Sequence, residues 1–282
     1  ADLMAQYDAV ICDVWGVVHN GRTAYTDACE RLTAYREDGG RVILLSNAPR
    51  SADTVADILR EKNVPDDCWD AIMSSGEISI REVAARGYQC VHHIGPSRDD
   101  DLFDQIAAAR VPLKDAQAIV ATGLIHDRTE TGEDYRDRLR DAASAKLPLI
   151  CANPDLVVDV GGTLLPCAGS IAAVYEDLGG PVYWAGKPHA DAYRAALACL
   201  SDLLARAGDA ATPNKARILA IGDAERTDIA GAVRFGLDAL FIGQGIHRET
   251  VMPDADTLDA DAVATLFAPH PHKPIAAMAS LR

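Results

Sequence analysis

The carboxylate of Asp13 is the first side chain in the sequence whose setting suggests chemistry. It follows an apolar run of strand length, residues 9–12, and precedes a turn that contains Gly16. In an open parallel sheet, ligands bind at the carboxyl ends of the strands, because the loops that leave those ends line the crevice there. A carboxylate at such an end is a candidate nucleophile or metal ligand. An ordinary turn aspartate that caps the next segment is the alternative.

Two further stretches have groups that can hold an anion. Ser46 and Asn47 follow the strand pattern of residues 41–45 and stand just before a helix pattern. A hydroxyl and backbone amides in that position can bind phosphate oxygens, helped by the positive end of the helix dipole, although an N-terminal cap explains the same residues. Lys187 lies between Gly186 and Pro188, where its ammonium can neutralise a phosphate as a point charge. A solvated loop lysine is the alternative there.

Two acids, Asp223 and Asp228, follow the buried strand pattern of residues 217–221. Gly222 allows the backbone to approach closely at this point. Oxygen ligands in such an arrangement suit a hard cation. Asp228 could instead cap the helix pattern of residues 229–235.

Strand and helix patterns alternate along the chain, which predicts an α/β protein. The predicted strands are residues 9–12, 41–45, 91–95, 118–123, 147–152, 182–185, 217–221 and 240–242, and the predicted helices are residues 26–38, 100–109, 131–145, 168–178, 190–207 and 229–235, with one more that opens near Ser51. The chemically suggestive strand ends lie before and after residues 82–182. We therefore interpret 82–182 as an inserted domain, because only a chain that returns to its first sheet can bring those ends together. The proline-rich stretch 270–274, with two histidines, is interpreted as a surface strap rather than a metal site.

Composition narrows the class of protein. The 282 residues are 49% hydrophobic and 24% charged, a globular mix, and the formal net charge of -15 argues against a nucleic acid or an anionic membrane as partner. The seven cysteines are scattered without a Cys-x-x-Cys pair, so neither a disulfide framework nor a zinc site is indicated. With no signal-peptide pattern and no apolar run of about 18 residues, the sequence predicts a cytoplasmic protein.

Taken together, the four stretches resemble the haloacid dehalogenase (HAD) superfamily in their order and arrangement. More narrowly, the chain resembles the class IIA branch, which includes the NagD-type sugar-phosphate and nitrophenyl phosphatases. The stretches that carry this narrower resemblance are residues 19–21, 152–155, 186–188 and 227–232. The resemblance covers nearly the whole chain and implies a Rossmann-like parallel-sheet core of residues 1–81 and 183–282, with an inserted α/β cap of the C2 type at 82–182.

The resemblance also implies roles for single residues. Asp13 would attack phosphorus and form an aspartyl-phosphate. Mg²⁺ would be held by Asp13, the backbone carbonyl of Trp15 and Asp223, with Asp228 ordering the waters of the metal. The phosphoryl oxygens would be bound by Ser46, the Asn47 amide and Lys187. In such an architecture the cap supplies specificity, so residues 122–124 and 153–159, with Asn153 and Asp155, are candidates for contacts with the organic part of a small phosphoester.

The sequence departs from the family at Trp15. The family's phosphatases usually carry there a second aspartate, which protonates the leaving oxygen and later activates water. Losing a positioned proton donor typically costs about 10² to 10⁴ in rate, unless a neighbour such as His19 or a cap residue replaces it. Three readings follow: a phosphatase of sugar, nucleotide, aryl or acyl phosphates with weakened acid catalysis, a phosphoester-binding or regulatory protein with little turnover, and a dehalogenase, since those enzymes tend to have an aromatic here. A homodimer stays open, because caps of this type often provide a dimer surface in the family.

Overall fold

The computed structural model describes residues 3–159, 163–208, 212–254 and 256–282, which form two compact units. The first unit consists of Ala1–Ser46, Ala56–Met73 and Ala192–Arg282, and the second of Asn47–Val55 and Ser74–Asp191. The chain thus leaves the first unit after Ser46 and again after Met73, and returns each time. The predicted division at residues 82 and 182 is coarser than this and stays a prediction.

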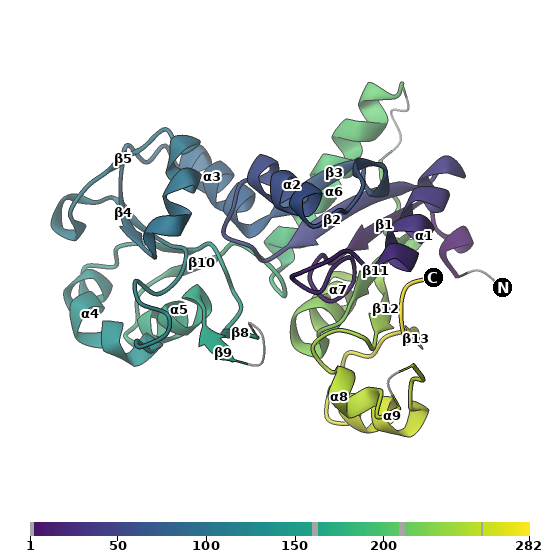
Figure 1. Cartoon of the computed structure of the whole chain (residues 1–282). Helices are drawn as coiled ribbons and strands as arrows, with labels where there is room; N and C mark the ends of the chain where they lie inside the picture. The colour runs from purple at the N-terminus through teal and green to yellow at the C-terminus, as the bar shows by residue number, and fades with distance from the viewer. Residues whose placement is uncertain (1–2, 160–162, 209–211, 255) are drawn as a thin grey trace. The chain divides into compact units, whose positions relative to one another are not determined.

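A six-stranded sheet in the order β13-β12-β11-β1-β2-β3 forms the centre of the first unit (Figure 1). Ala9 in β1 is aligned in parallel with Ile218 in β11 on one side and with Arg41 in β2 on the other. All four residues of β1 are buried, as expected of an apolar strand in the middle of a parallel sheet. The strands are β1 Ala9–Cys12, β2 Arg41–Ser46, β3 Ala71–Ser74, β11 Ile218–Gly222, β12 Asp238–Ile242 and β13 Ala276–Met278.

Helices alternate with these strands, as the crossovers between parallel strands require. They are α1 Thr26–Glu37, α2 Ala52–Glu61, α6 Ala190–Arg206, α7 Ala230–Phe235, α8 Arg248–Val251 and α9 Ala260–Phe267, of which α2 and α6 begin in the second unit. α7 ends at Gly236, whose φ of 88° is the left-handed conformation that glycine adopts without strain. Among the helices of the described ranges, none is both long and apolar enough to cross a membrane.

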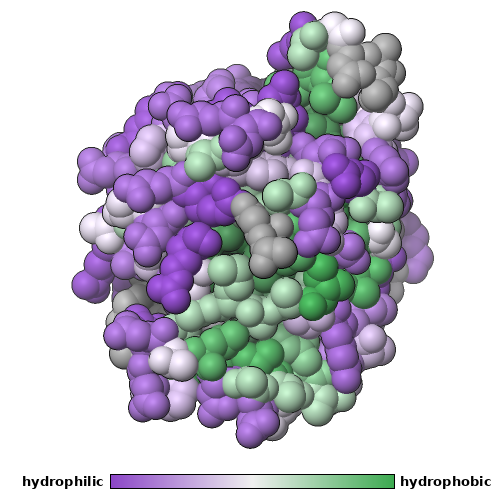
Figure 2. Space-filling view, turned by 90° about the vertical axis from the view of Figure 1, so that its right-hand side faces the viewer, coloured by the Kyte–Doolittle hydropathy of each residue, from purple (hydrophilic) through white to green (hydrophobic). Residues whose placement is uncertain are grey.

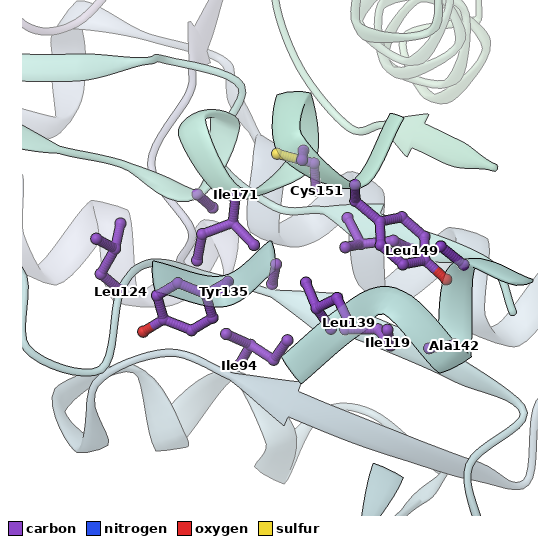
Figure 3. Close-up of a cluster of buried hydrophobic side chains, with 14 residues drawn as sticks. Ile94, Ile119, Leu124, Tyr135, Leu139, Ala142, Leu149, Cys151 and Ile171 are labelled. Atoms are coloured by element: carbon purple, nitrogen blue, oxygen red, sulfur yellow. The ribbon is translucent and has the colours of Figure 1, made fainter. Parts of the chain in front are cut away.

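The second unit is built on a five-stranded sheet in the order β10-β7-β6-β4-β5, in which every strand pair is parallel. Helices α4 and α5 pack on it through a cluster that includes Ile119, Tyr135 and Ile171 (Figure 3). The strands are β4 Cys90–Ile94, β5 Ala109–Arg110, β6 Ala118–Ala121, β7 Leu149–Cys151 and β10 Val182–Trp184, with a separate hairpin of β8 Val157–Asp159 and β9 Leu164–Pro166. The helices are α3 Ser75–Arg86, α4 Arg136–Ser144 and α5 Ala168–Asp177.

Short irregular turns complete the chain. The 3₁₀ turns are η1 Met4–Gln6, η2 Asp66–Cys68, η3 Ser97–Asp104, η4 Leu113–Asp115, η5 Gly132–Tyr135 and η6 Lys215–Arg217, and one π-helical turn, η7, spans Glu225–Ile229. On the face shown in Figure 2, hydrophobic residues gather in the middle and lower part, with others at the upper end, and hydrophilic residues surround them. Homodimer formation stays a prediction.

The predicted α/β class with parallel sheets is confirmed, but the helix predicted at 100–109 is wrong. Residues up to Asp104 belong to the 3₁₀ turn η3, and Ala109–Arg110 is strand β5. The aspartates of this stretch bind arginines: Asp99 and Asp101 pair with Arg50 at 3.0 and 2.7 Å. Aspartate is also a weak helix former because its carboxylate can hydrogen-bond nearby backbone groups in non-helical conformations. Strand β3, helix α3, the β8–β9 hairpin, helices α8 and α9 and strand β13 were also not predicted from the sequence.

Candidate active site

Three carboxylates lie together in the first unit, those of Asp13, Asp223 and Asp228. Their ligand oxygens are all within 4.8 Å of one another. The sheet explains this: Cys12 is aligned with Ile221, so the residues after β1 and after β11 leave the same edge of the sheet. The backbone N–H of Asp13 donates to the Ile221 carbonyl at 2.8 Å, which continues the ladder up to the acid. The predicted gathering of these three acids is thus found in the structure.

Backbone amides orient two of the acids. Asp223 Oδ2 accepts from the N–H of Ile246 at 2.7 Å, and Asp228 Oδ2 accepts from the N–H groups of Asp223 and Ala224 at 3.2 and 3.1 Å. Asp228 sits in the π-helical turn η7, a rare local structure that often occurs at functional sites. Tyr193 in α6 donates to the backbone carbonyl of Asp228 at 3.0 Å and supports this turn.

Glycines leave room for the carboxylates. A Cβ at Gly222 would overlap the side chain of Asp228, and a Cβ at Gly245 would overlap that of Asp223. The side chains of Asp223 and Asp228 therefore pack directly against glycine backbone, which leaves room for their oxygens to lie close together. Like charges at this separation repel, and a hard divalent cation that prefers oxygen ligands offsets the repulsion. The donor set and its cradle therefore fit such a cation, with Asp13, Asp223 and Asp228 as the residues that would hold it. The Trp15 carbonyl stays a predicted ligand.

The loop after Asp13 is held by packing between Trp15, His19 and Gly21. The indole ring meets the His19 ring edge-on, with ring centroids 5.3 Å apart, and a Cβ at Gly21 would overlap the indole. Trp15 is still 44% exposed, unusual for so large an apolar side chain. Trp15, which stands where the family's phosphatases usually have an aspartate, therefore places an indole that is held by its neighbours and accessible to solvent.

His19 does not offer the proton that Trp15 lacks. Its Nδ1 accepts a hydrogen bond from the N–H of Gly21 at 2.8 Å. Burial, with a smaller contribution from the charge of Lys62, lowers the pKa of His19 to about 4. Near neutral pH the ring is uncharged, so it is a structural support of the loop rather than an acid ready to protonate a leaving group.

The second unit holds another part of the predicted site. Asn47 Nδ2 donates to Asp155 Oδ1 at 2.9 Å and to the Lys187 carbonyl at 3.0 Å, and Asn47 Oδ1 accepts from the Lys187 N–H at 2.8 Å. Asn153 Oδ1 accepts from the N–H of Asp155 at 3.1 Å. The structure thus brings together Asn47, Asn153, Asp155 and Lys187, whereas Ser46 ends β2 in the first unit.

The two candidate specificity segments differ in accessibility. Thr122 and Leu124 are 2% and 0% exposed, and Thr122 Oγ1 lies 2.9 Å from His93 Nε2. Their side chains are part of the interior of the second unit. Leu156 and Val157, in contrast, are 47% and 46% exposed. The specificity hypothesis therefore rests on residues 153–159.

Sequence reasoning missed several residues that support the two clusters. Ser75 Oγ donates to Asn47 Oδ1 at 3.4 Å, and Glu225 forms a short hydrogen bond with His247 Nε2. Although burial opposes it, the hydrogen bond and charge of His247 hold the pKa of Glu225 below its usual value. His247 follows Ile246, whose amide orients Asp223, so the pair fastens that loop. The only signal in the sequence was Gly243-Gln244-Gly245 after a strand, which marks a turn but not the partner of His247.

The first unit, with an acid cluster at the carboxyl edge of an open parallel sheet, defines an α/β protein of the Rossmann-like kind. A model of the haloacid dehalogenase-like hydrolase family matches residues 10–108, and a HAD-hydrolase-like model matches residues 184–268. A hydrolase of the haloacid dehalogenase-like family from Brucella suis 1330 is 38% identical. The match to its crystal structure covers 100% of this chain and 98% of the Brucella chain, with a TM-score of 0.82. The chain belongs to the haloacid dehalogenase-like hydrolase family.

More distant similarities extend over most of the chain. The structure of the p-nitrophenyl phosphatase from Archaeoglobus fulgidus is 21% identical, covers 98% of this chain and 97% of its own, and has a TM-score of 0.75. The 5'-nucleotidase YutF of Bacillus subtilis (strain 168) is 23% identical in an alignment of 269 residues that covers 89% of this chain and 93% of that protein. The predicted resemblance to the HAD superfamily is confirmed, and the nitrophenyl phosphatase fold agrees with the narrower class.

Proposed function

We propose that this protein is a Mg²⁺-dependent phosphatase that hydrolyses small phosphomonoesters through an aspartyl-phosphate on Asp13. The observation that carries the proposal is the grouping of Asp13, Asp223 and Asp228 within 4.8 Å at one edge of the sheet. Relatives whose names are p-nitrophenyl phosphatase and 5'-nucleotidase support the same chemistry. Sugar, nucleotide, aryl and acyl phosphates are all within the proposed substrate class.

In this proposal an oxygen of the Asp13 carboxylate attacks phosphorus in line as the bond from phosphorus to the leaving oxygen breaks. Ser46, the backbone amide of Asn47 and Lys187 bind the phosphoryl oxygens, and Asp228 orders the surroundings of the cation. When bound, Mg²⁺ supplies positive charge next to the transferring group. Phosphoryl transfer depends mostly on such positioning and charge neutralisation. Water then hydrolyses the aspartyl-phosphate and regenerates Asp13.

Trp15 limits the leaving groups that this site handles well. An indole N–H donates a hydrogen bond but has no proton to transfer at neutral pH, and burial lowers the pKa of the neighbouring His19 to about 4, which supports weak acid catalysis here. Leaving groups that depart as stable anions, such as aryl oxides and carboxylates, do not need the missing acid. We therefore expect aryl and acyl phosphates to phosphorylate Asp13 much faster than alkyl phosphates.

The test is hydrolysis of p-nitrophenyl phosphate with Mg²⁺ and after EDTA treatment. Asp13→Asn removes the nucleophile, and the exposed Asp57→Asn is the matched control in the same unit. Metal-dependent turnover that is lost in Asp13→Asn and kept in Asp57→Asn supports the proposal. Turnover that survives Asp13→Asn contradicts the proposal. Halide release from a 2-haloacid without metal also contradicts it and indicates a dehalogenase.

The exposed Trp15 favours a second candidate, a phosphoester-binding or regulatory protein with little turnover. It predicts that inorganic phosphate binds to the wild type while p-nitrophenyl phosphate is not consumed. Trp15→Asp should then create hydrolysis, because it restores a carboxyl group beside an intact binding site. Rapid turnover by the wild type excludes this candidate.

A further inference from the structure

The side chain of Asn47 is almost completely buried in the second unit, with 8% of the residue exposed. A primary amide can donate two hydrogen bonds and accept two. Asn47 makes all four: it donates to Asp155 Oδ1 and to the Lys187 carbonyl, and accepts from the Lys187 N–H and from Ser75 Oγ. No hydrogen-bonding capacity of this side chain is left for a substrate. Its backbone amide, not its side chain, is the group that the proposed function uses.

Two of these bonds bind the backbone of Lys187 from both sides. The lysine's N–H and carbonyl are both held by one amide group, at 2.8 and 3.0 Å. Lys187 itself is 4% exposed. A Cβ at the preceding Gly186 would overlap Ser75 Oγ and Asn47 Oδ1. The backbone before the lysine therefore packs closely against these two side chains. Asn47 therefore holds both backbone polar groups of Lys187.

A third bond, to Asp155, connects this lysine to the segment that carries the specificity hypothesis. Asp155 lies 108 positions from Asn47 in the sequence, and its Oδ1 accepts from the same Nδ2 that donates to Lys187. Its backbone N–H is fixed by Asn153. Asp155 is thus part of the structure that surrounds Asn47, in addition to any contact with substrate.

We infer that Asn47 is a positioning residue: with Asp155 it clamps the backbone of Lys187 so that the ammonium is presented to the phosphoryl group. The inference rests on the proposed function for the phosphate role of Lys187, but the clamp itself does not. It assigns Asp155 to the phosphate end of the substrate, whereas a specificity role alone would leave Lys187 unaffected.

Two measurements on the full chain separate the clamp from the function. The first is the rate at which Lys187 is acylated by an amine-reactive ester, followed by peptide mass spectrometry. The second is the affinity for inorganic phosphate, measured by titration calorimetry in Mg²⁺. Asn47→Asp turns two donors into acceptors that face Asp155 and the Lys187 carbonyl, and Asn63→Asp makes the same change at an exposed position of the first unit.

We expect Asn47→Asp to raise acylation of Lys187 about tenfold, the size of effect that losing one or two buried hydrogen bonds gives. An added carboxylate would by itself favour the unreactive ammonium form, so faster acylation reports exposure and not charge. Asn63→Asp should acylate like the wild type. Wild-type acylation in Asn47→Asp overturns the clamp.

Asp155 supplies a second test that does not depend on Asn47 variants folding. Asp155→Asn and Asp155→Ala remove the same charge, but only the asparagine keeps an oxygen for Asn47 Nδ2. Asp155→Asn should keep slow acylation and most of the phosphate affinity, while Asp155→Ala should speed acylation and weaken phosphate binding about tenfold. Equal acylation in the two variants overturns the clamp. Faster acylation with unchanged phosphate affinity supports the clamp and contradicts the proposed phosphate role of Lys187.

Discussion

Mg²⁺ should raise the melting temperature of the wild-type chain, and Asp223→Asn should remove most of that rise. The ligand oxygens of Asp13, Asp223 and Asp228 lie within 4.8 Å of one another. Two unit charges at that separation repel by about 3 kcal/mol at an effective dielectric constant of about 20. A bound divalent cation converts this repulsion into attraction, so the folded state should bind Mg²⁺ and the unfolded chain should not.

The size of the shift follows from linkage. At a free Mg²⁺ concentration about 100 times Kd, binding stabilises the folded state by about 2.7 kcal/mol. For a domain of about 150 to 250 residues this corresponds to about 5 to 10 °C in melting temperature. Asp223→Asn keeps an oxygen that can accept from the N–H of Ile246, so the metal-free variant should melt no lower than the metal-free wild type while responding little to Mg²⁺.

The assay is thermal unfolding of EDTA-treated protein with and without excess Mg²⁺. Asp57→Asn is the control, because its side chain is 73% exposed on α2 in the first unit and distant in sequence from the three acids. It should show the full wild-type shift. A shift in Asp223→Asn as large as in the wild type, or no shift in the wild type at saturating Mg²⁺, would refute the reasoning.

Three further perturbations probe other parts of the molecule. Wild-type enzyme mixed with excess p-nitrophenyl phosphate should release about one equivalent of p-nitrophenol in a burst, because position 15 lacks a carboxylate base to activate water and the second step is slowed by about 10² to 10⁴. Trp15→Asp should abolish the burst, and a burst of unchanged size would contradict this. Burial lowers the pKa of His93 to about 4, against the opposing charge of Asp100. The contribution of His93 to the free energy of unfolding should therefore be fully present above the pKa of histidine in the unfolded chain, about 6.5. It should decrease by about 2 kcal/mol, discounted for solvent screening, as pH falls toward 4. His93→Gln should flatten this dependence on pH in urea titrations, and an equal dependence would exclude His93 as the cause. Gly186→Ala should cost about 1 to 3 kcal/mol by overpacking, and Gly123→Ala, where the nearest atom to an added Cβ is 3.3 Å away, should cost clearly less in the same denaturation assay.

Local patterns were enough to predict the strand ends that carry acids. An apolar run followed by Asp13, or by Gly222 and Asp223, encodes both the strand and its end, and parallel pairing of β1 with β11 then places the acids at one edge. The stretch around Asp99 shows where local reasoning fails. Its partner Arg50 lies in another part of the chain, and that pairing, which no local pattern contains, favours a 3₁₀ turn over the predicted helix. β13 was missed for a related reason, since Ala276–Met278 consists of alanines and a methionine, which favour helices, and becomes a strand by pairing with β12.

The side-chain partners of Asn47 could also not be predicted from the sequence. Asparagine after a strand and before a helix is typical of a cap or of an anion site, and the prediction of an amide that binds phosphate stays a prediction. Its side-chain partners lie 108 and 140 positions away. Such pairings follow from the insertion of one unit within the other, which the strand and helix patterns indicated only in outline.

The two polar clusters differ in a way that bears on how the protein acts. In the cluster around Asn47, the side-chain amide donates two hydrogen bonds and accepts two, all within the protein. These bonds hold the backbone of Lys187 in place. The cluster of Asp13, Asp223 and Asp228 gathers three carboxylates, and backbone amides orient two of them without cancelling the negative charge. The acid cluster therefore fits a cation, and the cluster around Asn47 holds the backbone of Lys187. Under the proposed function, phosphoryl transfer would use both, since a fixed ammonium and a charge-neutralising cation would each act on oxygens that carry negative charge throughout the reaction.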